Sequence, residues 1–223
     1  MGVLAAGIAC RTAGPADPPA APQPPAGAPS AQTPQPSAPP AIIQPGAPGQ
    51  PSKVMAPSGI VKIAHTKADT AFMQGMIGHH AQALDMVALL ETRTDSPEMK
   101  MLALRIKVSQ QDEIKFMQRW LRERGEAVPD EHAHHAHDFK LMPGMLSPEE
   151  MAKLAAAKGQ AFDRLFLEYM IKHHDGALMM VNELFKQDGA GQEADIYAFA
   201  SDVIADQQME IDRMIGMLRG MQK

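Results

Sequence analysis

The sequence contains an internal duplication that restricts the fold more than any other feature. Residues 69–87 align with residues 163–181, and residues 110–121 align with residues 207–218, in the same order along the chain. A repeat of this kind marks one supersecondary unit that is used more than once. The chain is therefore expected to fold as two similar halves.

Each duplicated segment has apolar residues at the spacing of an amphipathic helix. At about 100° per residue, matching apolar residues share one face of their segments. These residues are Phe72, Met76, Ala83, Val87 and Leu90 in the first half, and Phe166, Met170, Ala177, Val181 and Leu184 in the second. Helix starts are indicated at Ser96-Pro97 and at the capping box from Ser147 to Glu150, and a helix end at Gly125. The signals together predict helices over residues 67–94, 97–124, 148–187 and 192–221.

Two helical hairpins joined by one long connection predict an all-α fold, a four-helix bundle. The expected domain covers residues 65–223. Its parts are repeat one over residues 67–124, a histidine-rich loop over residues 125–147 and repeat two over residues 148–221.

The N-terminal segment has the composition of a tether rather than that of a packed domain. Fourteen of the 19 prolines lie in residues 1–52, so residues 1–55 are expected to hold a disordered linker. Residues 1–10 are apolar and end in Cys10, which is similar to the end of a bacterial lipoprotein signal. On this interpretation Cys10 is lipidated, and the protein resides in the periplasm or on the outer face of a bacterial membrane. The alternative is an ordinary disordered N-terminus.

Charge and cysteine content exclude several classes of protein. The formal net charge of −5 is spread over both signs without a basic run, which argues against nucleic acid and against an anionic membrane surface as partners. Cys10 is the single cysteine, so the chain has neither an internal disulfide nor a CxxC motif. No stretch approaches the roughly 20 apolar residues that span a bilayer, so the lipid anchor is the one membrane attachment expected.

Polar residues interrupt the apolar faces at the same positions in both halves. They are His79, His80, Gln110 and Glu113 in the first half, and His173, His174, Gln207 and Glu210 in the second. A buried imidazole or carboxylate is costly unless it is paired or bound to a metal. These eight groups therefore need partners inside the bundle.

One interpretation of this constellation is a metal site. Met76 and Met170 each lie one helical turn before the second histidine of their half. Thioethers with imidazoles and without a thiolate suit Cu(I) or silver, and imidazole also accepts Cu(II) and zinc. The predicted ligands are Met76, His79, His80, Met170, His173 and His174. Glu113 and Glu210, with Gln110 and Gln207, would accept hydrogen bonds from these imidazoles and fix their tautomers.

Two further properties of this site remain open at the level of sequence. The alternative to a metal site is a hydrogen-bonded core network in which each histidine pairs with the glutamate of its own hairpin. If a metal binds, its affinity should fall as the pH drops through about 6.5, the ordinary pKa of histidine.

The connection between the halves carries a second cluster of imidazoles. His132, His134, His135 and His137 lie within a short stretch of the expected loop. A histidine-rich tract of this kind binds Cu(II), zinc or nickel without a preformed geometry. The alternative is a polar loop without a ligand.

The motif from Phe72 through Met76 and His79-His80 to Ala83, followed by Gln110 and Glu113, resembles the bacterial family named domain of unknown function 305. The resemblance covers about residues 67–221. It implies a ferritin-like fold, export from the cytoplasm and a connection with copper binding. It also implies that Met76, His79, His80 and their counterparts in the second half match the family's motif positions.

These observations predict a non-enzymatic, extracytoplasmic protein that sequesters copper or transfers it to copper-handling proteins. A ferritin-like di-metal oxidase is the alternative from the enzyme class, although such sites need more carboxylates than the apolar faces supply. A metal-free helical interaction module is the third possibility. Association into a homo-oligomer is compatible with all three.

Overall fold

The computed structural model describes residues 42–44, 51, 53–55, 63–136 and 140–221. The chain divides into two units, residues 1–60 and residues 61–223. In the first unit, strand β1 (Ile42–Gln44) pairs antiparallel with strand β2 (Lys53–Met55), and Ile43 lies opposite Val54. β-branched residues in both strands favour extended backbone. Cys10 lies outside the described residues.

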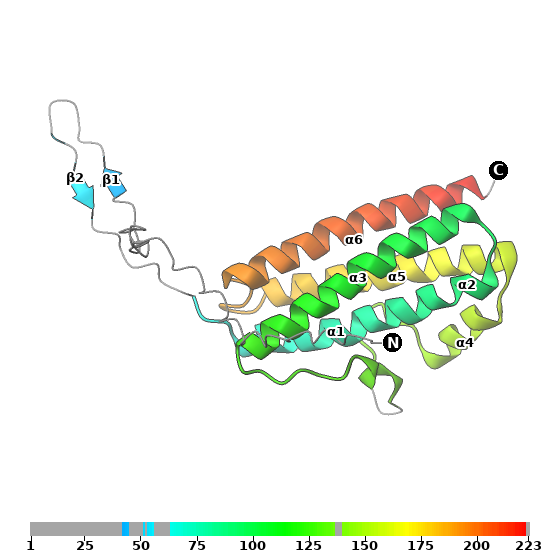
Figure 1. The fold of residues 1–223 in the computed structure, drawn as a ribbon, viewed down its shortest axis with the longest axis horizontal. Helices are drawn as coiled ribbons and strands as arrows, with labels where there is room; N and C mark the ends of the chain where they lie inside the picture. The colour runs from blue at the N-terminus through cyan, green and yellow to red at the C-terminus, as the bar shows by residue number, and fades with distance from the viewer. Residues whose placement is uncertain (1–41, 45–50, 52, 56–62, 137–139, 222–223) are drawn as a thin grey trace, which may run out of the picture. The chain divides into compact units, whose positions relative to one another are not determined.

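The second unit is an antiparallel bundle of four long helices. They are α1 (Lys67–Ala88), α3 (Pro97–Glu123), α5 (Gly159–Phe185) and α6 (Ala194–Gly220). Helix α1 packs on α3, α5 packs on α6, and contact between α1 and α5 joins the two hairpins (Figure 1). The ferritin-like, all-α four-helix bundle that the sequence predicts is confirmed.

Local capping residues set most of the helix ends. Ser96 accepts a hydrogen bond from the backbone N–H of Met99, and Ser147 forms a reciprocal capping box with Glu150. Each cap satisfies backbone N–H groups that lack a partner inside the helix. Gly125 follows α3 with φ of 70°, a conformation that glycine adopts at little cost. These ends agree with the positions predicted from the sequence.

Two predicted helices are divided in the structure. The helix expected over residues 148–187 consists of α4 (Pro148–Ala156) and α5, because Ala157 is extended and Gly159 has φ of 57°. This break lets α4 turn so that Leu154 is buried in the core. The helix expected over residues 67–94 consists of α1 and a single turn, α2 (Leu90–Arg93), on either side of Leu89.

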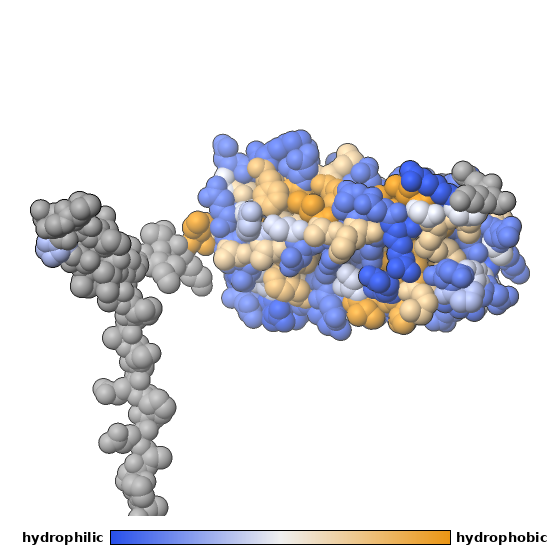
Figure 2. Space-filling model, turned by 90° about the horizontal axis from the view of Figure 1, so that it is seen from above, coloured by the Kyte–Doolittle hydropathy of each residue, from blue (hydrophilic) through white to orange (hydrophobic). Residues whose placement is uncertain are grey.

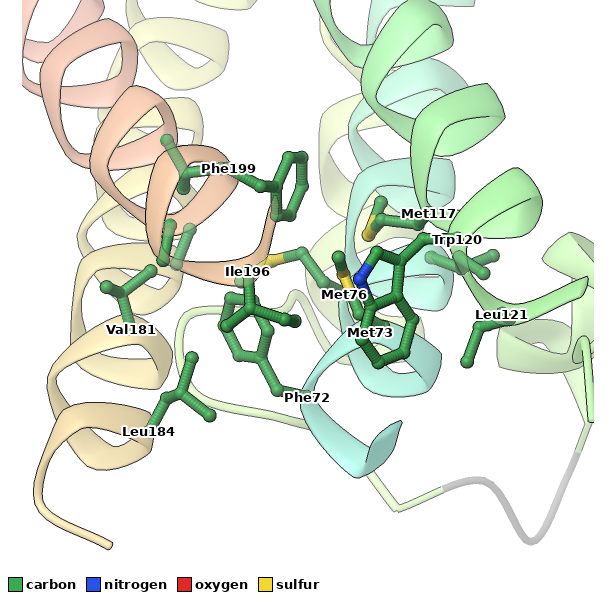
Figure 3. Close-up of a cluster of buried hydrophobic side chains, with 14 of the residues drawn as sticks. Phe72, Met73, Met76, Met117, Trp120, Leu121, Val181, Leu184, Ile196 and Phe199 are labelled. Carbon is green, nitrogen blue, oxygen red and sulfur yellow. The ribbon is translucent and has the colours of Figure 1, made fainter. Parts of the chain in front are cut away.

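The core of the bundle contains two apolar clusters. The first cluster joins the start of α1 to the ends of α3 and α5 and the start of α6, as Figure 3 shows for Phe72, Trp120, Leu184 and Phe199. The second cluster joins the end of α1 to the start of α5, with Met86 and Phe166 among its buried members. On the face of the bundle in Figure 2, apolar side chains emerge in separate patches among polar ones.

None of the helices in the described ranges combines the length and hydrophobicity that crossing a membrane requires.

Candidate metal centre

Four histidines lie in the middle of the bundle and form what we call the central histidine layer: His79 and His80 of α1, and His173 and His174 of α5. All four residues are at most 1% exposed. The rings of His79 and His173 are 3.9 Å apart between centroids, so the two halves meet at this layer. The inward orientation predicted for both histidine pairs is confirmed.

Each half pairs one of these imidazoles with a carboxylate of its own hairpin. Nε2 of His80 lies 2.5 Å from Oε2 of Glu113 on α3, and Nε2 of His174 lies 2.6 Å from Oε2 of Glu210 on α6. Nε2 of His174 donates a hydrogen bond to Glu210, whereas Nε2 of His80 and Oε2 of Glu113 are in close contact without hydrogen-bond geometry. An imidazole whose one hydrogen is on Nε2 has a lone pair on Nδ1. Both Nδ1 atoms are buried and have no hydrogen-bond partner among the described residues. A neutral imidazole with a lone pair that accepts no hydrogen bond is the form that binds a metal ion.

The glutamines predicted beside these carboxylates are also buried. Gln110 is 1% exposed and Gln207 is 2% exposed. In the described part of the chain, the Oε1 atom of each lacks a hydrogen-bond partner. The duplicated halves thus bury a glutamine at matching positions.

The connection between the hairpins adds a contact that sequence reasoning missed. The carbonyl of Pro143 accepts a hydrogen bond from Nε2 of His79 over 3.0 Å, which leaves Nδ1 of His79 buried without a partner among the described residues. The loop approaches α5 this closely because Gly176 has no side chain, since a Cβ there would collide with the Pro143 carbonyl. Gln82 holds the same loop on α1 through two hydrogen bonds to the backbone of Leu146.

Burial keeps the imidazoles of His79 and His173 neutral. Burial lowers the pKa of His79 to about 3, repulsion from His80 and His174 adds to this effect, and the hydrogen bond to Pro143 opposes it. Burial and the neighbouring imidazoles lower the pKa of His173 well below its usual value. These two rings therefore resist protonation at pH values somewhat below 6.5, the ordinary pKa of histidine.

The carboxylate of Glu113 is held in its charged form. Burial raises its pKa, but attraction to the closely placed imidazole of His80 and the hydrogen bond from Ser109 outweigh this effect, so the pKa lies below the usual value. Glu113 and Glu210 each line a surface pocket between α3 and α6. These carboxylates therefore connect the buried imidazoles with solvent.

The two predicted methionine ligands lie in different apolar clusters. Met76 and Met170 are both fully buried. Met76 belongs to the first cluster, where Figure 3 shows it beside Met73 and Met117, and Met170 belongs to the second. Since α1 and α5 contribute the central histidine layer between these clusters, one thioether is placed on each side of it.

The histidine-rich connection forms a separate group. A 3-10 helix, η1 (Glu131–His135), packs on α1 and brings Nε2 of His134 and Nε2 of His135 each within 2.7 Å of Oδ2 of Asp85. Sequence reasoning missed Asp85, a half-buried residue of α1, because its partner His134 lies 49 residues further along the chain. His132 is exposed and lies outside this group, and the predicted loop ligand His137 lies outside the described residues.

Comparisons with known proteins agree with this architecture. The model of the family Domain of unknown function (DUF305) matches residues 69–218. A DUF305 fragment from Deinococcus radiodurans is 31% identical, with a TM-score of 0.58 over 69% of this chain and 97% of that chain. A DUF305 protein from Streptomyces coelicolor, named as secreted, is 28% identical, with a TM-score of 0.59 over 70% of this chain and 94% of that one.

A third similar structure was solved with metals. CopM in its Cu(I)-bound form is 29% identical, with a TM-score of 0.54 over 68% of this chain and 96% of that chain. CopM was also solved in Cu(II)-bound, silver-bound and apo forms.

A curated relative shares a shorter region. The uncharacterized protein L153 of Acanthamoeba polyphaga mimivirus is 43% identical over 56 residues, which are 25% of this chain. The match spans 37% of the length of that protein.

Proposed function

The chain belongs to the DUF305 family, and we propose that it is an extracytoplasmic protein that binds copper and sequesters it or passes it on. The observation that carries this proposal is the pair of buried Nδ1 atoms of His80 and His174, which lack hydrogen-bond partners among the described residues. Each belongs to an imidazole whose other nitrogen contacts a carboxylate. Such a contact orients a ligating histidine and increases its basicity.

The ligands of the proposed centre are Met76, His79, His80, Met170, His173 and His174. Neutral imidazole with thioether is a soft to borderline donor set, which favours Cu(I) and Ag(I) and also admits Cu(II). The low pKa of His79 and of His173 keeps these rings available as ligands in mildly acidic solution. The CopM structures with Cu(I), Cu(II) and silver support the same choice of metals.

An extracytoplasmic location is part of this proposal and is supported by the name of the Streptomyces coelicolor protein. In that setting the protein would exchange the ion with other copper-handling proteins. Binding and release need no reacting group beyond the ligands, so the proposed role is not enzymatic.

The test is a Cu(I) titration against a competing chelator, with the full chain at neutral pH. The paired substitution His80→Ala with His174→Ala removes one ligating imidazole from each half and should weaken binding by at least about tenfold. Met76→Leu with Met170→Leu conserves the packing volume, so stability should change by less than about 1.5 kcal/mol while Cu(I) affinity falls.

His65→Ala is the matched control, since it removes an imidazole that pairs with Glu126 at 3.0 Å, outside the central histidine layer. Its Cu(I) affinity should equal that of the parent. If the paired histidine substitution retains the parent's affinity, the central histidines form a structural network and the proposal fails.

A further inference from the structure

The group formed by Asp85, His134 and His135 lies apart from the central histidine layer and has its own chemistry. Its three ligand atoms, one from each residue, lie within 4.8 Å of one another. They come from two elements, since Asp85 is on α1 and both histidines are on η1. The side chain of His134 is 2% exposed, whereas that of His135 is 57% exposed, so the group opens to solvent on one side.

The hydrogen bonds of His134 leave a mismatch at its second nitrogen. Nδ1 of His134 lies 2.7 Å from the carbonyl oxygen of Glu131, which only accepts, so Nδ1 must donate the hydrogen. A neutral His134 then directs the lone pair of Nε2 at the carboxylate oxygen of Asp85, 2.7 Å away. Two acceptors at this distance require a cation, either a second proton on the ring or a metal ion.

A single metal ion satisfies all three ligand atoms at once. Nε2 of His135 lies 2.7 Å from the same oxygen of Asp85. Protons satisfy the two contacts only if each ring carries a hydrogen on Nε2, which makes His134 an imidazolium, whereas one metal ion would bind both nitrogens and the carboxylate. The hydrogen bond from Nδ1 of His134 to a backbone carbonyl is the contact that commonly orients a ligating histidine.

We propose that Asp85, His134 and His135 bind a divalent metal ion of borderline hardness, Zn²⁺ or Cu²⁺. Two imidazole nitrogens and one carboxylate oxygen suit these ions, and the solvent-exposed side leaves a coordination position for water or a transferred group. The set has no sulfur donor, so it differs from the thioether-containing centre proposed for Cu(I). The protein would thus carry one site for a soft monovalent ion and another for a divalent ion.

The elements that carry these ligands are anchored, which favours a defined site over loose chelation by a histidine tract. The N-cap of η1 is Asp130, whose side chain accepts from the backbone N–H of His132. On α1, Gln82 lies one turn before Asp85 and binds the backbone of Leu146. Gln82 and Asp85 both line the pocket beside the site. The connection is therefore held to α1 close to the proposed ligands.

The experiment is a Zn²⁺ titration of the metal-free full chain against a chromophoric chelator, repeated with Cu²⁺. Asp85→Asn, His134→Ala and His135→Ala should each weaken binding by about tenfold or more and remove one equivalent of tightly bound Zn²⁺. Asp85→Asn preserves shape and removes only charge and ligand strength, so a folded variant is expected, with circular dichroism as the check. His65→Ala, which removes an imidazole paired with a different carboxylate, should bind Zn²⁺ as the parent does.

Two outcomes would overturn the proposal. If His132→Ala weakens Zn²⁺ binding as much as His135→Ala, the histidine tract chelates without a defined site. If Asp85→Asn binds with the parent's affinity, Asp85 is only an ion-pair partner of the histidines. Neither outcome depends on the buried copper centre, because the Cu(I) titration of the His80 and His174 variants decides that centre separately.

Discussion

The two hairpins differ one helical turn before the glutamate of each His–Glu pair. In the first hairpin, Ser109 donates a hydrogen bond to Glu113 over 3.2 Å. The corresponding residue of the second hairpin is Asp206, which places another carboxyl group near Glu210. Burial and the nearby charges of Glu113, Glu210 and Asp202 raise the pKa of Asp206. One half thus places a hydrogen-bond donor beside its glutamate, whereas the other places a carboxyl group there, near both Glu113 and Glu210.

The hairpins also differ in the contacts that they make with the loop between them. On α1 the loop is clamped by the amide of Gln82, whereas the corresponding position on α5 is Gly176, where the loop lies directly against the helix backbone. The duplication accounts for the features that the two hairpins share, and the single connection accounts for these differences between them. Both halves repeat the buried imidazoles and carboxylates, and the connection makes their surroundings unequal.

The largest effect that tests this comparison concerns the buried rings of His79 and His173 in the metal-free protein. Their pKa values are lower in the folded than in the unfolded chain. Their contribution to stability is therefore complete above the unfolded value of about 6.5 and is lost as the pH falls toward the folded values. Stability should fall below pH 6.5 by up to about 1.4 kcal/mol per pH unit for each ring.

Urea denaturation between about pH 4 and pH 8.5 measures this slope. His79→Gln and His173→Gln should each remove about half of it, and neither should alter the slope above about pH 7.5, where histidine is neutral in both states. If the two substitutions reduce the slope by different amounts, the hydrogen bond of His79 to the Pro143 carbonyl gives the two histidines different pKa values. An unchanged slope in both variants would mean that the rings accept protons in the folded state.

The second prediction concerns the different contacts that the loop makes with α1 and with α5. Gly176→Ala places a Cβ against the Pro143 carbonyl and the backbone of Gly144, and overpacking of this kind costs about 1–3 kcal/mol. Gly216→Ala in α6 is the matched control, because nothing lies within 4 Å of the added Cβ. That variant should gain about 0.5–1 kcal/mol from helix propensity. Urea denaturation compares the two, and equal gains would show that the loop does not pack on α5.

The sequence predicts the bundle and the central histidine layer because both follow from local patterns. Helical spacing and the caps at Ser96 and Ser147 report the helices directly. The positions of His80 and His174 on the apolar faces then determine that they are buried. Their contacts with Glu113 and Glu210 follow from the hairpin geometry, which the repeat specifies twice.

The remaining features depend on contacts that no local pattern reports. The partner of His79 is the backbone carbonyl of Pro143, which has no side-chain signal. Asp85 joins the histidine site through a connection 49 residues further along the chain. The break before α5 depends on the backbone conformation of Gly159, whereas the apolar spacing continues across it. The sequence therefore indicates which donors are buried more readily than which groups surround them.

The smallest predicted effect concerns the position one helical turn before the glutamate of each hairpin, where one half has serine and the other has aspartate. Asp206→Ser gives the second half the residue that the first half has at Ser109. The raised pKa of Asp206 means that its protonated form favours folding, and that this stabilisation is lost as the pH rises through its folded value. At pH 7 the charged carboxylate opposes folding, so Asp206→Ser should increase stability by about 0.5 kcal/mol or less, the range of a partly exposed charge. The gain should vanish below about pH 3.9, the ordinary pKa of aspartate.

Ser109→Asp should cause a loss of similar size at pH 7 and raise the pKa of Glu113, which NMR titration of its carboxyl carbon would record. If Asp206→Ser instead destabilises the protein at pH 7, Asp206 makes a favourable contact that outweighs its repulsion from Glu113 and Glu210.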